Sequence, residues 1–500
     1  MMRNLISTFA LLSAVASRCS AQDAFPAAAS RTNTFNASYG ALNPDQALDI
    51  IKAANLSDAQ TEAVLVAVNF ERSNWAGSSA QLDLFYRDIP ANTSGSNSSV
   101  PAVAGTPLKV EQRTNTSLYT LPPGVALSRI LFTTETLNGT IVPASAFVLW
   151  PWQGRRSKSA ASNNETGGLP VVGWAHGTSG WSAECGPSHI RNLWYQYSAP
   201  FTLALQGYVV VAPDYAGLGV DRDAEGNFIA HQYGANPAHG NDLVFAVDAA
   251  REAWSARLGR SKFVLVGHSQ GGGAAWGAAE RLAHHPVEGY VGTVAASPSV
   301  SIADVAKLAA DNPLIGGGLA KLATGLSSVF PDFELGDWLS DEGVRTTVAL
   351  QKLQGCQSVG LEIHANPGLA RDGWADTYYL DAFDRLTRVG GKEFAGPMLV
   401  LQGSADPSVP AVLTTAAVNQ TCAALPGSKL QYTVLEGVGH VPVLFAGQQI
   451  WLDWIADRFD GVEITEGCTF ETPTAELEVE AYQADIGYTL QYALYSYETA

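Results

Sequence analysis

One five-residue stretch, Gly267-His-Ser-Gln-Gly271, constrains the fold of this chain most strongly. The apolar run Phe263–Val266 precedes it and is typical of a buried strand, and a Gly- and Ala-rich helical pattern follows it. Small residues flank a serine in this way where a strand turns sharply into a helix, because the turn is strained and crowded. We therefore predict that Ser269 stands exposed above a sheet as a nucleophile; the alternative is an ordinary Gly-rich turn.

A serine nucleophile needs a base within hydrogen-bond reach and a carboxylate that orients the base. Where a Gly-x-Ser-x-Gly turn joins a strand of an α/β sheet to a helix, the chain order of the three groups is serine, acid, histidine. His440 is the strongest candidate base, since it lies in a glycine-flanked loop after the apolar run Leu430–Leu435. Its alternative role is that of a structural loop histidine.

Asp406 is the best candidate for the acid. It comes just after the apolar run Pro397–Gly403, and Pro407 stiffens the turn that holds it. Glu436 competes because it closes the strand before the histidine loop, but it lies only four residues from His440. We therefore predict Asp406 as the residue that orients His440.

Two backbone N–H groups are expected to stabilise the negative oxygen that develops on the carbonyl group when the serine attacks it. The first is that of Gln270, at the N-terminus of the predicted helix. The second should come from the loop His176-Gly-Thr178, which follows the apolar run 169–175, because glycine lets the backbone turn its N–H groups inward. We assign Thr178, with Gly177 as the adjacent alternative.

Buried strands alternate with helical patterns along most of the chain. Such alternation predicts an α/β fold with a mostly parallel central sheet, right-handed crossovers and helices on both faces. Asn138-Gly139, between two β-rich runs, predicts a tight hairpin. The other expected strands are 169–175, 207–213, 263–268, 290–295, 397–403 and 430–435; the expected helices include 44–54, 57–75, 192–205, 241–254 and 443–459.

Composition divides the chain into six parts. The insertion at residues 299–395, between the two core segments, is mostly helical by pattern. Its apolar stretch 314–330 fits either a lid or a packed cap helix. The acidic tail has no Lys or Arg, and 476–482 alternates like a half-buried strand. The expected parts are a signal peptide (1–21), a helical, glycosylated N-terminal extension (22–127), the first core segment (128–298), a cap or lid (299–395), the second core segment (396–460) and an acidic C-terminal extension (461–500).

The N-terminus predicts secretion, because Arg3, a short apolar core and small residues up to Ala21 form a signal-peptide pattern. Cleavage there removes Cys19 and leaves four cysteines in an oxidising compartment, so we expect two disulfides. Of the three possible pairings we favour Cys185–Cys356 and Cys422–Cys468, as an assumption about which cysteines are neighbours. Eight Asn-x-Ser/Thr sequons agree with secretion: Asn36, Asn55, Asn92, Asn97, Asn115, Asn138, Asn164 and Asn419.

The charge balance excludes some partners. With 47 acidic against 29 basic residues the formal net charge is −18. So acidic a chain argues against nucleic acid and against docking to anionic lipid. No other stretch is long and apolar enough for stable membrane insertion. The chain has no metal-binding or nucleotide-binding motif, so we predict no metal and no cofactor.

Taken together, these motifs resemble the secretory lipase family of α/β-hydrolases, the fungal type of secreted lipase or esterase. The resemblance covers roughly residues 128–460. It implies ester hydrolysis through an acyl-enzyme, with Ser269 as nucleophile, Asp406 as acid and His440 as base. The matching blocks are Trp174-Ala-His-Gly-Thr-Ser-Gly180, Cys185-Gly-Pro-Ser188, Ala212–Gly219, Gly267–Gly272, Gly403–Asp406 and Gly439-His440.

The chain departs from the family in its long N-terminal region, its acidic Tyr-rich tail and its His231-Gln-Tyr233, where the family commonly has His-Pro-Tyr. These departures bear on the substrate more than on the chemistry. We expect a secreted carboxylic ester hydrolase, a lipase or broad esterase, that acts on an ester or lipid substrate. A serine peptidase or acyltransferase with the same three residues, and a non-catalytic glycosylated binding protein with the same fold, are the alternatives. The oligomeric state is not predicted.

Overall fold

The computed structural model describes residues 42–90, 103–155, 168–259, 261–309 and 316–484. All of them belong to one compact unit, Ser38–Ala500. The predicted signal peptide and the sequons at Asn36, Asn92, Asn97 and Asn164 lie outside the described residues.

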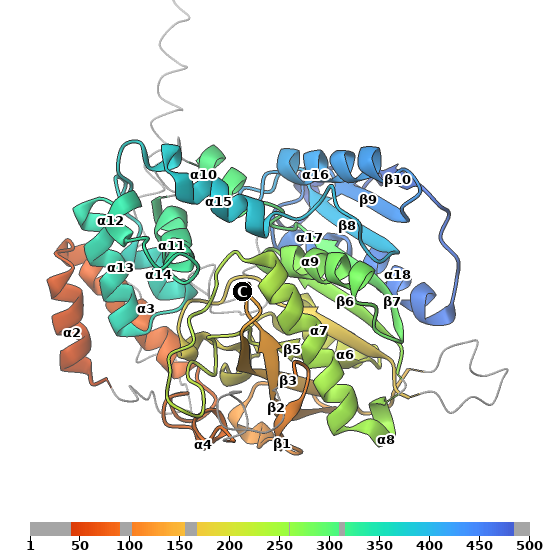
Figure 1. The fold of residues 1–500 in the computed structure, drawn as a ribbon, viewed down its shortest axis with the longest axis horizontal. Coiled ribbons are helices and arrows are strands. Elements are labelled where there is room, and N and C mark those ends of the chain that lie inside the picture. Colours follow the sequence, from red (N-terminus) through yellow and green to blue (C-terminus); the bar gives the residue numbers. More distant parts are fainter. Residues whose placement is uncertain (1–41, 91–102, 156–167, 260, 310–315, 485–500) are drawn as a thin grey trace, which may run out of the picture. The chain divides into compact units, whose positions relative to one another are not determined.

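A ten-stranded sheet crosses this unit in the order β1-β2-β3-β5-β4-β6-β7-β8-β9-β10 (Figure 1). The pairs β1/β2, β2/β3 and β3/β5 are antiparallel, and all the others are parallel, which confirms the predicted mostly parallel α/β sheet. The strands are β1 (Pro107–Glu111), β2 (Val125–Glu135), β3 (Ile141–Pro151), β4 (Val171–Ala175), β5 (Val209–Pro213), β6 (Phe263–His268), β7 (Tyr290–Ala296), β8 (Met398–Gly403), β9 (Leu430–Leu435) and β10 (Cys468–Glu471).

Successive side chains of a strand point to opposite faces of its sheet, and β6 divides two hydrophobic cores in this way. Val264 and Val266 join one core, whereas Phe263 and Leu265 join the other. Both faces are therefore apolar along the same strand, as a strand covered on both sides requires. The first face is covered by α6 (Pro200–Leu205) and α18 (Gln448–Asp460), and the second by α7 (Asn236–Ala253) and α9 (Gln270–His284).

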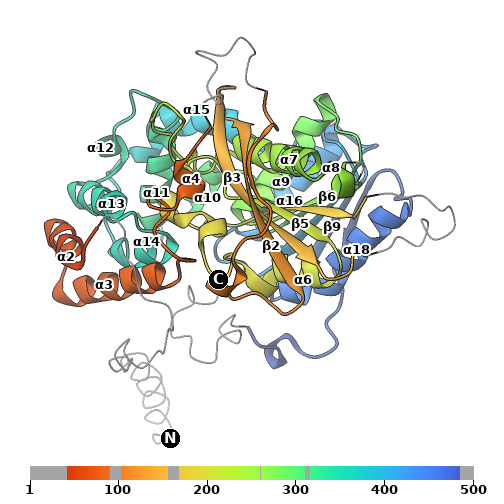
Figure 2. The ribbon, with the colours of Figure 1, turned by 90° about the horizontal axis from the view of Figure 1, so that it is seen from below.

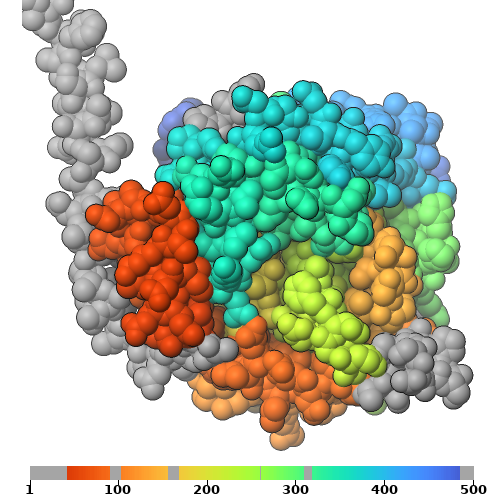
Figure 3. Space-filling view, turned by 60° about the vertical axis from the view of Figure 1, so that its left-hand side comes forward, coloured from red at the N-terminus to blue at the C-terminus, as the bar shows by residue number. Residues whose placement is uncertain are grey.

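The segment between β7 and β8 is helical, and the N-terminal helices pack against it (Figures 2 and 3). Buried side chains of the two regions, among them Ile51, Val68, Leu350 and Val359, form one hydrophobic cluster. The N-terminal helices are α2 (Pro44–Ala53) and α3 (Asp58–Ser73); the inserted helices are α10 (Ile302–Ala309), α11 (Gly316–Ser327), α12 (Leu335–Trp338), α13 (Asp341–Leu353), α14 (Gln357–Ile363) and α15 (Tyr378–Thr387).

Buried polar contacts reinforce this packing. The Glu71 carboxylate accepts hydrogen bonds from the N–H groups of Cys356 and Val359, each at 2.8 Å. Arg72 donates to the carbonyl of Leu353 at 2.8 Å. Burial raises the pKa of Glu71 to about 7, although both N–H groups favour its ionised form. Residues far apart in sequence thus share one hydrogen-bonded core.

Two disulfides cross-link the unit in the favoured pairing. Cys185–Cys356 joins the loop after β4 to the residue that precedes α14, over a separation of 171 residues. Cys422–Cys468 spans 46 residues and joins α16 (Ala411–Ala424) to β10. The first therefore ties the inserted helices to the sheet, and the second ties down the edge strand.

Three expected elements are corrected by the structure. The helix predicted over 192–205 is limited to Pro200–Leu205, because Leu193, Trp194 and Gln196 have positive φ angles, which an α-helix excludes. The helix predicted over 443–459 is two helices, α17 (Pro442–Ala446) and α18, with Gly447 between them.

The half-buried strand predicted over 476–482 is also wrong. This segment is mostly exposed and contains one 3-10 turn, Val479–Ala481, because β10 already occupies the edge of the sheet beside β9. At the other edge, β1 and the start of β2 precede residue 128, where we placed the beginning of the core. The edge strand β1 has only five residues and no clear alternation of apolar and polar side chains, so its pattern does not predict a strand.

The described sequons Asn55, Asn115, Asn138 and Asn419 are all exposed. Asn138 lies in the turn of the β2–β3 hairpin, as the Asn-Gly pair predicts. Among the described residues, no helix combines the length and the apolar character that a membrane span needs.

Candidate active site

Ser269 lies between β6 and α9 in a strained backbone conformation. Its φ is 60° and its ψ is −122°, a region that non-glycine residues rarely adopt. The turn leaves no space for side chains beside it: a Cβ on Gly267 would lie 1.9 Å from the carbonyl oxygen of Gly271, and one on Gly271 would lie 2.0 Å from that of Ala175. The two flanking glycines are therefore required sterically, and the strain holds Ser269 at the end of the sheet.

His440 and Asp406 are hydrogen bonded to one another. Nδ1 of His440 lies 2.7 Å from Oδ2 of Asp406, whose side chain is fully buried. The histidine side chain keeps 15% of its surface exposed. The loop after β9 thus carries a histidine that is oriented by a carboxylate from the loop after β8.

The surroundings of Asp406 favour its ionised form. Its Oδ1 accepts the N–H groups of Ser408 and Val409 at 2.9 and 2.8 Å, and Gln402 donates to Oδ2 at 3.2 Å. Burial alone would raise the pKa of this carboxyl, but the contact with His440 and the backbone N–H groups outweigh burial and hold the pKa below its usual range. Asp406 therefore remains a carboxylate at neutral pH and accepts the Nδ1 proton of His440.

The loop after β4 approaches the serine closely. A Cβ on Gly177 would lie 3.2 Å from the Cβ of Ser269 and 2.1 Å from the hydroxyl of Tyr195, so only glycine fits there. Thr178 follows at the cavity wall, and its hydroxyl lies 3.2 Å from that of Tyr233. The loop predicted to supply the second N–H donor thus lies directly beside the serine.

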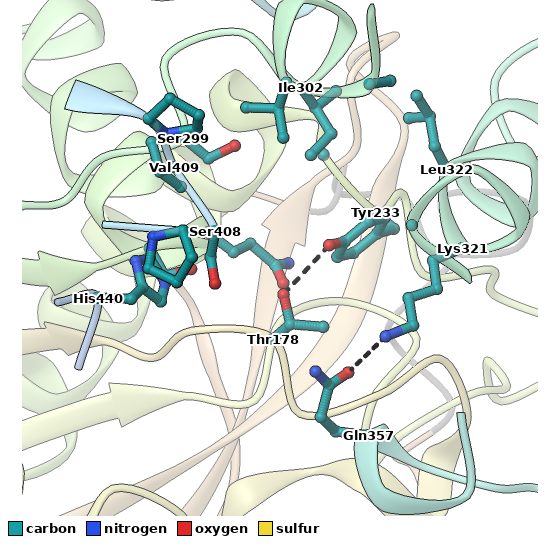
Figure 4. A pocket seen from close by; sticks show the side chains of 18 of the residues that line it. Thr178, Tyr233, Ser299, Ile302, Lys321, Leu322, Gln357, Ser408, Val409 and His440 are labelled. Atoms are coloured by element: carbon teal, nitrogen blue, oxygen red, sulfur yellow. Dashed lines mark hydrogen bonds between the residues drawn. The ribbon is translucent and has the colours of Figure 1, made fainter. Parts of the chain in front are cut away.

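Ser269, Gln270, Thr178 and His440 line one cavity of about 390 Å³. In Figure 4, His440 and Ser408 lie on one side, with Thr178 and Tyr233 between them and the opposite wall. The opposite wall belongs to the inserted helices and includes Ile302, Val305, Ala306, Lys321 and Leu322. The cavity therefore lies between the ends of the sheet strands and the insertion, with Asp406 buried behind His440.

Sequence reasoning missed a bridge formed by His268, the residue before the serine. Its Nε2 lies 2.9 Å from the carbonyl oxygen of His440, so Nε2 carries the proton that is donated. Its Nδ1 then accepts the Tyr195 hydroxyl proton at 2.6 Å. Burial, with a contribution from His440, lowers the pKa of His268 to about 3, so it stays neutral. His268 therefore joins the serine turn to the histidine loop, a role that no sequence pattern indicates.

A second contact missed in the sequence holds the side chain of Gln270. Its amide nitrogen lies 3.2 Å from Nε2 of both His231 and His239. Nδ1 of His231 donates to the carbonyl of Ala216 at 3.1 Å, which leaves Nε2 free to accept. Burial lowers the pKa of His239 to about 3 and that of His231 well below its usual value, so both rings are neutral acceptors. These contacts fix the residue whose N–H is expected to face the substrate.

No group of three His, Cys, Asp or Glu side chains within the described ranges has the arrangement of a metal site.

Gln232, in the His231-Gln-Tyr233 segment, has a structural contact. Its side chain accepts the N–H of Leu137 at 2.8 Å and so contacts the β2–β3 hairpin.

The fold has the architecture of the alpha/beta hydrolases. The chain belongs to the alpha/beta hydrolase family, whose sequence model matches residues 172–450. A comparison with curated protein sequences gives no match.

Solved structures similar to the chain include lipase A of Candida antarctica in its closed state. The TM-score is 0.61 and the identity 18%, over 80% of this chain and 93% of the lipase. Another is the rice cell wall degrading esterase LipA of Xanthomonas oryzae, with a TM-score of 0.52 and 18% identity over 71% of this chain and 97% of the esterase. At such low identities the likeness establishes the fold alone.

Proposed function

We propose that the protein is a secreted serine hydrolase of carboxylic esters, a lipase or broad esterase. One observation carries the proposal: Ser269, at a strained strand–helix turn, lines a cavity together with His440, whose Nδ1 lies 2.7 Å from Asp406. A nucleophile, a base and an orienting carboxylate are the groups that acyl transfer requires. Similarity to a lipase and an esterase agrees with an ester substrate.

In this proposal His440 acts through Nε2, since Nδ1 is engaged by Asp406. Nε2 takes the Ser269 hydroxyl proton as the oxygen attacks the ester carbonyl, and the oxyanion is stabilised by the N–H groups of Gln270 and Thr178. His440 then gives this proton to the departing alcohol, leaving an acyl-enzyme. A water molecule, activated by the same histidine, hydrolyses the acyl-enzyme and restores Ser269.

The insertion 299–395 is proposed to act as the cap that selects the substrate. The support is that α10 and α11 line the cavity opposite His440. Packing of α2 and α3 against α13 and α14 suggests that the N-terminal extension supports this cap. Two disulfides and exposed sequons agree with secretion and N-glycosylation.

Chromogenic esters of rising acyl length test the proposal, with wild type and Ser269→Ala compared. Hydrolysis that depends on Ser269 and rises with chain length at an interface indicates a lipase; dependence limited to short chains indicates an esterase. Activity that survives Ser269→Ala would contradict the assignment of the nucleophile.

Absence of ester turnover would favour the other classes. Covalent labelling of Ser269 without ester turnover points to a peptidase, and product esters formed on addition of an alcohol point to an acyltransferase. Neither turnover nor labelling would indicate a binding protein with this fold.

A further inference from the structure

The cavity wall formed by the insertion contains one buried cation, Lys321 of α11. The residue is only 8% exposed and lines the cavity that also holds Ser269 and His440. Figure 4 shows Lys321 and Gln357 together on the side of the cavity opposite His440. A charged group is rarely placed in so buried a position without a partner, because burial removes its hydration.

The contacts of Lys321 within the described ranges leave its charge without a counter-ion. The ammonium donates to the Gln357 amide oxygen at 3.2 Å and lies 5.1 Å from the ring centre of Trp181. Among the described residues, salt bridges between a lysine and a carboxylate are formed by Lys109, Lys307 and Lys392. Lys321, by contrast, is buried and its contacts among the described residues are with neutral groups.

Lys321 is charged at neutral pH despite its burial. Burial lowers the pKa of its ammonium to about 8, because the charged form loses hydration. His364, the titratable group that interacts with it, has a pKa lowered to about 3 by burial and so is neutral near pH 7. An anion that enters the cavity would meet a poorly solvated positive charge, and such a pair is strong.

Apart from Lys321 and Gln357, the residues that the inserted helices contribute to this wall are apolar or glycine. Ile302, Val305 and Ala306 of α10 and Leu322 of α11 line the same cavity as the cation. A ligand that satisfies both features has an apolar chain with a negative end. We propose that Lys321 forms a carboxylate-binding subsite, which selects ester substrates carrying a carboxylate at the far end of an apolar chain, such as half-esters of dicarboxylic acids. This inference rests on the proposed ester hydrolysis at Ser269.

Matched pairs of substrates test it. The 4-nitrophenyl half-esters of adipic, suberic and sebacic acids are compared with the 4-nitrophenyl esters of hexanoic, octanoic and decanoic acids. Wild type is expected to favour at least one half-ester over its neutral partner. Lys321→Met keeps the length of the side chain but removes the charge, and should lower the ratio of kcat/KM for half-ester over neutral ester by about tenfold to a hundredfold. Hydrolysis of the neutral esters should persist.

Two further variants strengthen the test. Gln357→Glu places a carboxylate beside the ammonium and should cause a similar loss of preference without removing Lys321. Lys307→Met is the matched control, because Lys307 lies on α10, pairs with Asp381 at 3.3 Å and keeps 45% of its side chain exposed. It should leave the preference unchanged.

The results separate the inference from the function on which it rests. If the enzyme hydrolyses neutral esters but Lys321→Met does not change the ratio of kcat/KM for half-ester over neutral ester, the subsite is overturned. The proposed ester hydrolysis is not affected by that result. If wild type hydrolyses neither series, the proposed function fails, and calorimetric binding of monomethyl suberate decides the subsite. Binding that Lys321→Met weakens about tenfold supports it, and binding that is absent or indifferent to the variant overturns it.

Discussion

The two walls of the cavity differ in origin and chemistry. One wall consists of loops that follow sheet strands, and it presents Ser269, Thr178 and His440, backed by hydrogen bonds. The other consists of inserted helices, and it presents apolar side chains and Lys321. Parallel strands fix the first wall tightly, whereas the second depends on helix packing and one disulfide. If the proposed function holds, substitutions in one wall should change the reaction chemistry and substitutions in the other should change substrate choice.

The largest expected effect concerns the strand-loop wall. Asp406→Asn should lower kcat about ten-thousand-fold, because an amide stabilises the wrong tautomer of His440. Steady-state kinetics on a neutral ester measure the effect, and circular dichroism verifies folding. The matched control is Glu436→Gln, at the exposed competitor carboxylate near the same histidine, which should retain activity. The reverse result would show that the orienting acid was misassigned.

Gly271→Ala tests whether the turn itself is indispensable. The added Cβ would lie 2.0 Å from the carbonyl oxygen of Ala175, so the backbone must shift at the serine. We expect a loss of about 3 kcal/mol in the free energy of unfolding and about a hundredfold in kcat. Gly427→Ala, where a Cβ meets nothing within 4 Å, is the control. Equal, small effects of both changes on urea unfolding and activity would contradict the steric account.

The two disulfides allow the link between the two walls, Cys185–Cys356, to be compared with a link at the edge of the sheet, Cys422–Cys468. Replacing Cys185 and Cys356 by serine should lower the free energy of unfolding by about 4 kcal/mol, and replacing Cys422 and Cys468 by about 1 kcal/mol less. The difference follows from the separations of 171 and 46 residues that the bonds close. Urea denaturation of both double variants measures it. A larger loss from the edge-strand bond would indicate that the link to the insertion contributes less than its loop length predicts.

The smallest expected effect is a pH dependence in the helical wall. Burial lowers the pKa of His364 to about 3, so the folded protein keeps it neutral while the unfolded chain protonates it below its usual pKa of 6.5. Its contribution to stability is therefore complete above about pH 6.5 and is lost as pH falls, by about 2 kcal/mol at pH 5. His364→Gln should reduce the stability lost between pH 7 and pH 5 by this amount in urea titrations. An unchanged loss would assign the acid sensitivity to other groups.

The two walls also differ in how far the sequence predicts them. Glycines around Ser269, the proline after Asp406 and the loop of His440 each have a local steric reason, so their positions at strand ends could be predicted; their catalytic roles are proposals. The bridge through His268 depends on contacts with Tyr195 and His440, which are distant in sequence. Packing of α3 on α14, and the burial of Lys321, likewise arise from tertiary contacts that helical periodicity does not specify.

The central claim is that Ser269 is an activated nucleophile. Its most direct test is reaction with a fluorophosphonate, followed by peptide mass spectrometry and residual ester hydrolysis on the same sample. The account predicts one phosphonyl group per chain, located on Ser269, with activity lost in proportion to labelling and no reaction in Ser269→Ala. Labelling at another residue, or full hydrolytic activity after Ser269 is labelled, would contradict it.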